Sequence, residues 1–110
     1  MTDLEITRSC AEAMGHEMGG VMSLADPERV YAKNAEGFND GTYSLYNPLH
    51  DDAQAMALVK KFNLWISAPH GLCNWWSVSS DESWAEYAQD LNRAICECVA
   101  KMQLAKASAT

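Results

Sequence analysis

The segment SDESWAEYAQDLNRAICECVAKMQLAKA, residues 80–107, carries the strongest structural signal in the chain. Its apolar side chains recur without a break at steps of three and four residues, at Trp84, Tyr87, Ala88, Leu91, Ile95, Cys98, Val99 and Met102. This spacing is typical of one face of an amphipathic helix. We therefore predict a helix over about 82–104.

Two β-rich runs precede this helix. LWISA (64–68) and CNWWSVS (73–79) flank the four residues PHGL, which predicts a β-hairpin over about 64–79. Adjacent residues in a strand point to opposite faces of the sheet, so Trp75 and Trp76 must face opposite sides. If only one face is covered, one of these side chains belongs to the core and the other is exposed.

The beginning of the chain predicts another helix. Thr2 and Glu5 have the spacing of a capping box, and Gly15 suits the left-handed position that ends many helices. The apolar residues between them lie on one face. We predict a helix over about 2–14 that packs with the hairpin.

The stretch YNPLHDDAQAMALVKKF, residues 46–62, predicts a third helix, over about 48–62. Two starts are open. Asn47 followed by Pro48 is a helix-entry signal, and Asp51 with Gln54 has capping-box spacing. Acidic side chains are favourable at the positive N-terminus of a helix, which gives Asp51 and its neighbour a structural reason to be there.

The region 16–43 is rich in turn-forming glycine and proline, and within it 29–33 suits either a short strand or one helical turn. Together these elements predict an α+β fold in which helices pack with a small antiparallel sheet. A length of 110 residues is typical of one domain, so we expect residues 1–110 to form a single domain.

Charge restricts the class of partner. The formal net charge is −7, and all of it falls in residues 1–52, which hold ten acidic and three basic residues. Nucleic acid and anionic membranes require clustered Lys and Arg, so neither is expected as a partner. A basic protein surface suits this charge, although solubility alone is a sufficient explanation.

Acidic residues interrupt the beginning of the chain, and no apolar run approaches the roughly 20 residues that span a bilayer. We therefore expect a cytoplasmic protein. In that compartment the four cysteines should remain thiols, at Cys10, Cys73, Cys96 and Cys98.

No motif for catalysis, a cofactor or a metal stands out. Cys73 with His50 or His70 is a formal nucleophile pair without any cysteine-enzyme signature around it. His70 and Cys73 lack the second pair of ligands that zinc requires. We therefore predict a protein that is not an enzyme, with no catalytic residue, no cofactor and no metal site.

The candidate residues for an interaction fall in two places. One is the polar cluster before the predicted third helix, and the other is the tryptophan pair of the hairpin, because exposed aromatic side chains are common interface hot spots. The candidates are Tyr46, Asn47, His50, Asp51, Asp52, Trp75 and Trp76.

The segments YNPLHDDAQAMALVKKFNLWI and LNRAICECVAKM resemble the phage ABA-sandwich proteins, with a looser likeness to the NinX-like phage proteins. The shared pattern is an aromatic-Asn-Pro-Leu segment, two acids at Asp51 and Asp52, an Ala-rich helix, and a late Arg93-Ala94-Ile95. His50 stands where the family usually has Thr. The resemblance implies helices against a small antiparallel sheet and a phage accessory protein in the cytoplasm of a bacterial host.

Three functional hypotheses follow. The first is binding to a host protein, with inhibition of a host defence or regulatory complex through the acidic surface as its concrete form. The second is capture of a nucleotide-like ligand between aromatics such as Tyr46 and Trp75, with helix-start N–H groups as anion donors. An enzyme is the third and least supported. A homodimer that uses the exposed sheet or the final helix would cover the same aromatic side chains.

Overall fold

The computed structural model describes residues 2–19, 29–33, 43–72, 74–80 and 85–108, and there the chain has the predicted α+β fold. The helices are α1 (Asp3–Met14), α3 (Asp52–Phe62) and α4 (Leu91–Ser108). Antiparallel strands β1 (Val30–Lys33) and β2 (Tyr43–Tyr46) pair in one sheet. A second antiparallel sheet has the order β3 (Trp65–Ser67), β4 (Trp76–Ser79), β5 (Ala85–Ala88).

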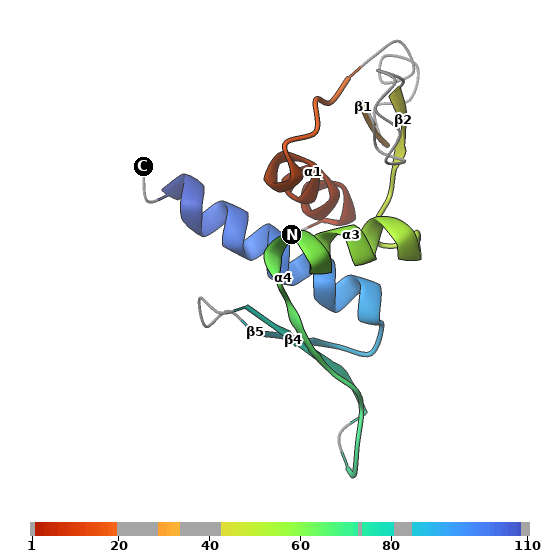
Figure 1. Ribbon diagram of the computed structural model, residues 1–110, viewed down its shortest axis with the longest axis vertical. Helices are drawn as coiled ribbons and strands as arrows, with labels where there is room; N and C mark the ends of the chain where they lie inside the picture. The colour runs from red at the N-terminus through yellow and green to blue at the C-terminus, as the bar shows by residue number, and fades with distance from the viewer. Residues whose placement is uncertain (1, 20–28, 34–42, 73, 81–84, 109–110) are drawn as a thin grey trace.

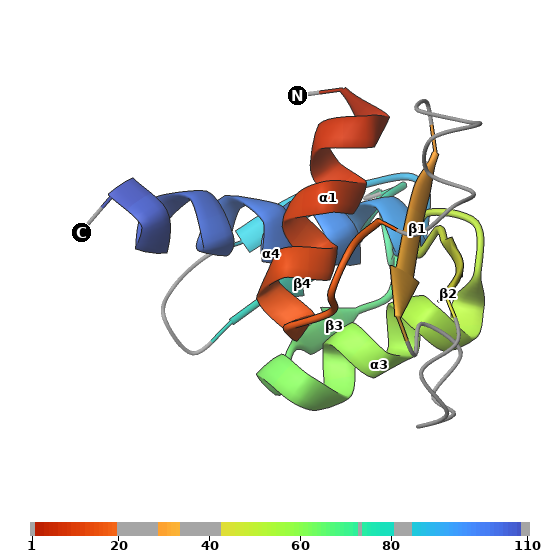
Figure 2. The ribbon, with the colours of Figure 1, turned by 90° about the horizontal axis from the view of Figure 1, so that it is seen from above.

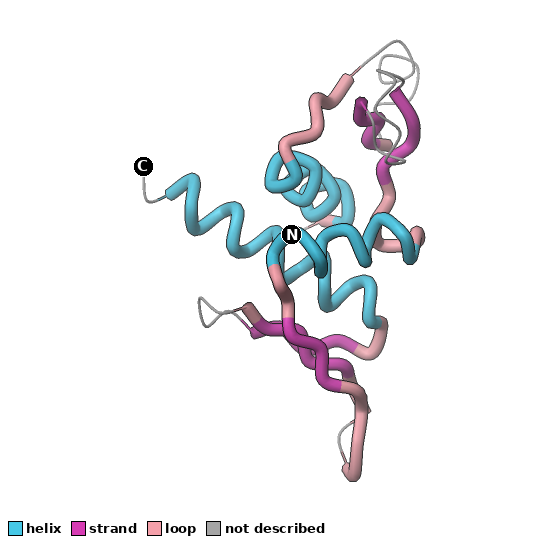
Figure 3. The backbone as a smooth tube through the Cα atoms, viewed as in Figure 1, coloured by secondary structure: helices cyan, strands magenta, loops and turns pink. Residues whose placement is uncertain are grey.

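The helices form the middle of the molecule, and the two sheets lie toward its opposite ends (Figure 3). Helix α4 packs with the β4–β5 side of one sheet and with α1 and α3 on its other side (Figure 1). In the view from above, α1 crosses α4, and the β1–β2 pair lies beside α1 and α3 (Figure 2). Buried side chains from all three helices and from β1, β2 and β4 belong to one hydrophobic core.

Helix α4 is buried on opposite sides. Cys96 and Cys98 are two residues apart, so their side chains point about 200° apart around the axis, yet both are fully buried. On the first side the Sγ of Cys10 in α1 donates a hydrogen bond to the carbonyl of Cys96 at 3.4 Å. On the second side burial and the carboxylate of Glu86 in β5 raise the pKa of Cys98 to about 11. Small side chains on α4 permit this close packing.

Both predicted ends of α1 are confirmed. The Thr2 hydroxyl accepts a hydrogen bond from the backbone N–H of Glu5 at 3.2 Å, as an N-cap does. At the other end Gly15 has a φ of 76°, and its N–H and that of His16 donate to the last carbonyls of the helix. Local sequence is sufficient to define this helix because both caps are encoded within one or two residues of its ends.

The prediction for the third helix, 48–62, was wrong at its start. Asp51 is the N-cap, and α3 begins at Asp52 and ends at Phe62. Of the two predicted starts the Asp51–Gln54 pair is therefore the one that operates. Asn47 instead begins a turn, in which its carbonyl accepts hydrogen bonds from the N–H groups of His50 and Asp51 at 3.0 and 2.9 Å.

The predicted hairpin is confirmed as β3 paired with β4, but the prediction of a helix from about residue 82 was wrong. Residues 85–88 form β5, which pairs with β4, and α4 extends from Leu91 to Ser108. The Asp90 carboxylate accepts a hydrogen bond from the N–H of Arg93 at 3.1 Å, which places the helix start there. Strand β5 supplies the backbone partners that the other edge of β4 would otherwise lack. Residues 81–84 lie outside the described part of the chain.

In the region 16–43, residues 30–33 form the strand that was one of two predicted alternatives. Its partner β2 was not predicted. An isolated bridge joins Met18 to Ala32, so the chain after α1 also runs beside β1. The predicted turns within 20–28 and 34–42 lie outside the described residues.

Substitutions on α4 should distinguish its enclosed part from its open end. Ala100 is 0% exposed, so Ala100→Leu adds volume where neighbouring elements enclose the helix. We expect this change to lower the free energy of unfolding by about 1–3 kcal/mol. Ala105→Leu is the matched control, because Ala105 borders an open cavity beside Phe62 and Met102, where a larger side chain fits. Urea unfolding of both variants tests this, and equal destabilisation would contradict the buried position of α4.

Candidate functional site

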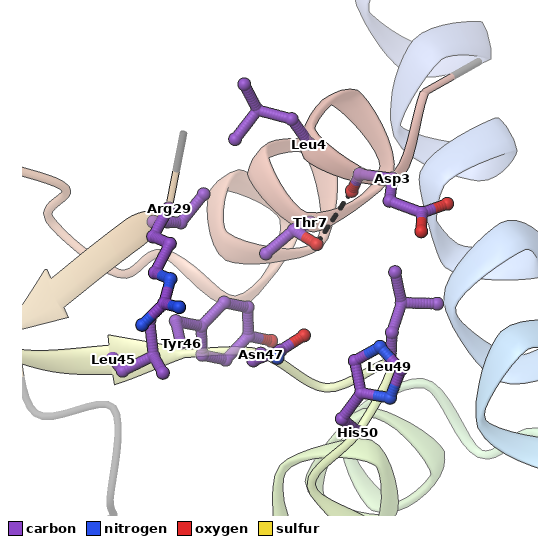
Figure 4. Close-up of a pocket in the computed structure, with 10 residues that line it drawn as sticks. Asp3, Leu4, Thr7, Arg29, Leu45, Tyr46, Asn47, Leu49 and His50 are labelled. Atoms are coloured by element: carbon purple, nitrogen blue, oxygen red, sulfur yellow. Dashed lines mark hydrogen bonds between the residues drawn. The ribbon is translucent and has the colours of Figure 1, made fainter. Parts of the chain in front are cut away.

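A pocket of about 340 Å³ opens between the first turns of α1, the β1–β2 pair and the turn before α3 (Figure 4). Apolar side chains make up much of its wall, from Leu4, Val30, Leu45, Tyr46 and Leu49. Polar side chains complete it, from Asp3, Thr7, Arg29, Asn47 and His50. The volume falls near the lower end of the range for small-molecule sites, roughly 300–1,000 Å³.

Gln54 of α3 holds the β2 end of this pocket in place. Its side-chain oxygen accepts a hydrogen bond from the N–H of Asn47 at 2.6 Å, and its side-chain nitrogen donates to the carbonyl of Leu45 at 3.1 Å. The two bonds bracket Tyr46, which lies between these residues. Because Gln54 is buried, loss of its amide would leave two backbone groups without their partner. Gln54 is therefore a positioning residue for the pocket.

Polar contacts also order the α1 side. The Thr7 hydroxyl donates to the carbonyl of Asp3 at 2.8 Å (Figure 4), and the Asp3 carboxylate accepts from the guanidinium of Arg93 at 2.9 Å. Arg93 also pairs with Glu97, one helical turn further along α4. Asp3 is exposed, so these ion pairs orient the side chains more than they stabilise the fold.

Tyr46 lies in the apolar part of the pocket wall and is only 2% exposed. Its ring meets His16 edge to face, with ring centroids 5.2 Å apart. Burial, with the nearby thiols of Cys10 and Cys96, raises the pKa of Tyr46 above its ordinary value. Its hydroxyl has no hydrogen-bond partner among the described residues. Tyr46 is thus a wall and core residue, and its hydroxyl is not presented to solvent.

Asp51 and Asp52 border the pocket without lining it. The Asp51 carboxylate accepts a hydrogen bond from the N–H of Gln54 at 3.0 Å, which is the N-cap interaction of α3. The Asp52 carboxylate accepts from the side-chain amide of Asn92 at 2.8 Å and so connects α3 to α4. The start of α3 is thus a sufficient structural reason for Asp51 and Asp52 to be at these positions. Both side chains remain exposed.

The structure brings together Tyr46, Asn47 and His50 but separates them from the tryptophan pair. Trp75 and Trp76 belong to the β3–β4–β5 end of the molecule, with α3 and α4 between them and β2 (Figure 1). Tyr46 and Trp75 therefore do not flank a common ligand, and the predicted aromatic clamp was wrong. As expected for a sheet covered on one face, Trp76 is half-buried and Trp75 is exposed.

Sequence reasoning missed the pocket residues that come from distant parts of the chain. The sequence predicts only that Asp3 and Thr7 belong to a helix and that Arg29 begins either a short strand or one helical turn. Arg29 and His50 lie on opposite sides of the pocket (Figure 4). No local signal relates these residues, because they meet only after β1 pairs with β2 beside α1.

Among the described residues, no three His, Cys, Asp or Glu side chains gather closely enough to hold a metal ion. Cys10, Cys96 and Cys98 are buried free thiols in the core. Cys73, one member of the formal nucleophile pair, lies outside the described residues. The described helices include none that is both long and apolar enough to cross a membrane.

Comparison of the chain with protein-family models, with curated proteins and with solved structures finds no match. The likeness to phage ABA-sandwich proteins therefore stays a prediction.

The cap of α3 is testable with two variants at one position. Asp51→Ala removes the acceptor for the Gln54 N–H, and we expect it to lower the free energy of unfolding by about 0.5–2 kcal/mol. Asp51→Asn retains a capping oxygen and removes the charge, so its loss should be less than half as large. Chemical unfolding of both variants separates the two contributions. Equal losses would assign the effect to charge alone.

The environment of His16 predicts a pH dependence. Burial lowers the pKa of His16 below its ordinary value of 6.5, a hydrogen bond with the backbone of Lys33 offsets part of this, and the charge of Lys61 lowers it further. The unfolded chain therefore binds the proton more readily, so the stabilisation is present above about pH 6.5 and is lost as pH falls below it.

His16→Phe keeps a ring against Tyr46 but does not titrate. Between about pH 7.5 and pH 5 we expect the wild type to lose more thermal stability than this variant. Melting curves of both proteins at several pH values measure the difference. Parallel losses would show that other groups account for the pH dependence.

Proposed function

We propose that this protein acts by binding another protein through the pocket and the acidic side chains around it. In the form that follows from the phage resemblance, the partner is a bacterial host protein, and binding inhibits a defence or regulatory complex. The single observation that supports this most is a partly apolar pocket placed among exposed carboxylates at the starts of two helices.

The pocket suits an anchoring side chain of a partner. Leu4, Leu45 and Leu49 provide apolar contact area, and Leu45 is 38% exposed in the free protein. Interfaces derive most of their affinity from a few side chains that enter such partly enclosed sites. Asn47 and His50 on the pocket wall supply groups able to form hydrogen bonds with the partner's backbone.

The surrounding charge suits a basic partner. Asp3 and Glu5 stand in the first turn of α1, Asp51 and Asp52 stand at the start of α3, and all four are exposed. These four carboxylates outnumber the two guanidinium groups nearby, Arg29 on the pocket wall and Arg93 beside Asp3. An excess of negative charge steers a basic partner and accelerates association. Such steering weakens as salt shortens the Debye length from about 10 Å at 0.1 M to about 3 Å at 1 M.

The pocket volume also favours a second function, the binding of a small ligand. Two features count against a phosphate-bearing one. Asp51 already occupies a backbone N–H at the start of α3, and it and Asp52 repel an anion there. A thermal-shift screen with nucleotides distinguishes the two functions, since a ligand at 100 times its Kd adds about 2.7 kcal/mol of stability. No shift with any nucleotide removes this alternative.

The main proposal is tested by retention from a bacterial lysate. Tagged wild-type protein should retain a host protein that elutes as salt is raised from about 0.1 M to about 1 M. The double variant Glu5→Gln/Asp51→Asn, which lowers the negative charge by two and keeps a cap, should retain less of it. Leu45→Ser should weaken the purified complex by about tenfold or more, because it removes apolar contact. Mass spectrometry identifies the protein, and titration measures its affinity.

Glu12→Gln is the matched charge control, because Glu12 stands in the last turns of α1, away from the pocket. We expect this variant to bind almost as the wild type does. A captured protein whose affinity is the same at low and high salt would contradict charge-assisted binding. If the captured protein binds Leu45→Ser and the double variant as tightly as the wild type, its binding site on this chain is not the pocket.

A further inference from the structure

The sheet β3–β4–β5 has one face without cover from the rest of the described chain. Val78 in the central strand is fully buried toward α4, so its neighbours Ser77 and Ser79 point to the opposite face. Residues paired across an antiparallel sheet share a face. The strand residues on this outer face are Trp65, Ser67, Ser77, Ser79, Ala85 and Tyr87.

Large aromatic side chains stand on this outer face. Trp65 is 71% exposed and Tyr87 is 61% exposed. Trp75, which directly precedes β4, is also 47% exposed. The open face of an antiparallel sheet is usually polar, and clustered exposed aromatics on a soluble protein mark an interaction surface.

The surface shape of the outer face is complementary to a second copy of itself. Trp65 of β3 is paired with Ser79 of β4, and Tyr87 of β5 is paired with Ser77 of β4. The central strand β4 therefore presents small serine side chains between one large aromatic side chain on each neighbouring strand. In a two-fold arrangement the same patch meets itself, and a residue of one copy contacts a different residue of the other. The aromatic side chains of one copy then fit over the serines of the second copy.

Charge also favours a second copy as the occupant. None of the described residues on the outer face is charged, although the chain carries a net charge of −7. Two identical copies repel one another least where the charged side chains are farthest from the contact. The same face lacks the Lys and Arg side chains that nucleic acid or an anionic membrane would require.

We propose that this outer face is a homodimer interface, in which two copies pack sheet against sheet. Fully covered aromatic side chains bury about 150–250 Å² each, so the exposed parts of Trp65 and Tyr87 offer on the order of 200–300 Å² per copy. That is about a third of the roughly 800 Å² per partner in a standard interface. The serines and alanine between them add a smaller area, so the contact is modest and the dimer is expected in the micromolar range.

The dimer leaves the pocket free. Its lining comes from α1, the β1–β2 pair and the turn before α3, and includes no residue of β3, β4 or β5. The sheet β3–β4–β5 and the β1–β2 pair lie toward opposite ends of the molecule (Figure 1). Each dimer therefore retains two pockets outside its interface. A host assembly with repeated subunits would then be bound at two points, which raises apparent affinity without any new contact.

Sedimentation equilibrium of the full chain tests the dimer. Between about 1 µM and about 200 µM, where a contact of this size equilibrates, the mass should rise from 12.2 kDa toward twice that value. Trp65→Ser and Tyr87→Ser, made separately, should each weaken dimerisation by at least about tenfold. Met56→Ser is the matched control, because Met56 is 42% exposed and belongs to α3 and not to the outer face, and this variant should dimerise within about twofold of the wild type.

Circular dichroism and melting curves show whether each variant is folded, and two separate variants keep the test decisive if one is not. Salt distinguishes this proposal from the proposed function. The dimer should persist or strengthen at about 1 M salt because repulsion between copies is screened, whereas the host complex should weaken. A monomer at every concentration, or a dimer unaffected by both substitutions, overturns the inference. Neither result bears on retention of a host protein by the pocket.

Discussion

The burial of α4 on two opposite sides is the constraint on which the rest of the structure depends. Cys96 meets α1 and Cys98 lies toward β5, so neither side of the helix can move without opening a packed contact. Small side chains such as Ala94 and Ala100 let the neighbouring elements approach closely. Because α4 fills the space between them, the pocket and the aromatic sheet face are held apart.

The pocket depends on a second, more local constraint. Gln54 accepts from Asn47 and donates to Leu45, and thereby joins the end of β2 to the first turn of α3. A buried amide with both its groups satisfied is expensive to displace. Asp3, held by Arg93, completes the opposite wall from α1. The shape of the pocket therefore follows from how α1, β2 and α3 are joined to the core. This shape should be stable without a ligand.

The pocket and the outer sheet face differ in the interactions that would govern binding. The pocket lies among exposed carboxylates, so the binding proposed there should respond to salt and to the charge of the partner. The outer sheet face has aromatic and hydroxyl side chains without charge in its described part, so binding there is governed by apolar burial and shape. Under the two proposals, the chain assembles with itself through the outer sheet face and with a different protein through the pocket.

The sequence by itself determined the features that depend on neighbouring residues. Both caps of α1, the β3–β4 hairpin and the opposite facing of Trp75 and Trp76 could be predicted because each is encoded within a few positions. For α3 the local pattern offered two starts, and only the structure decided for Asp51. The cluster of Tyr46, Asn47 and His50 was readable for the same reason. Only the tertiary structure decided that residues 85–88 form a strand, since their apolar spacing also suits a helix and the free edge of β4 selects between the two. It alone brought Asp3 and Arg29 to the pocket and left the aromatic sheet face open, because these features arise from contacts between segments far apart in the chain, which local patterns do not encode.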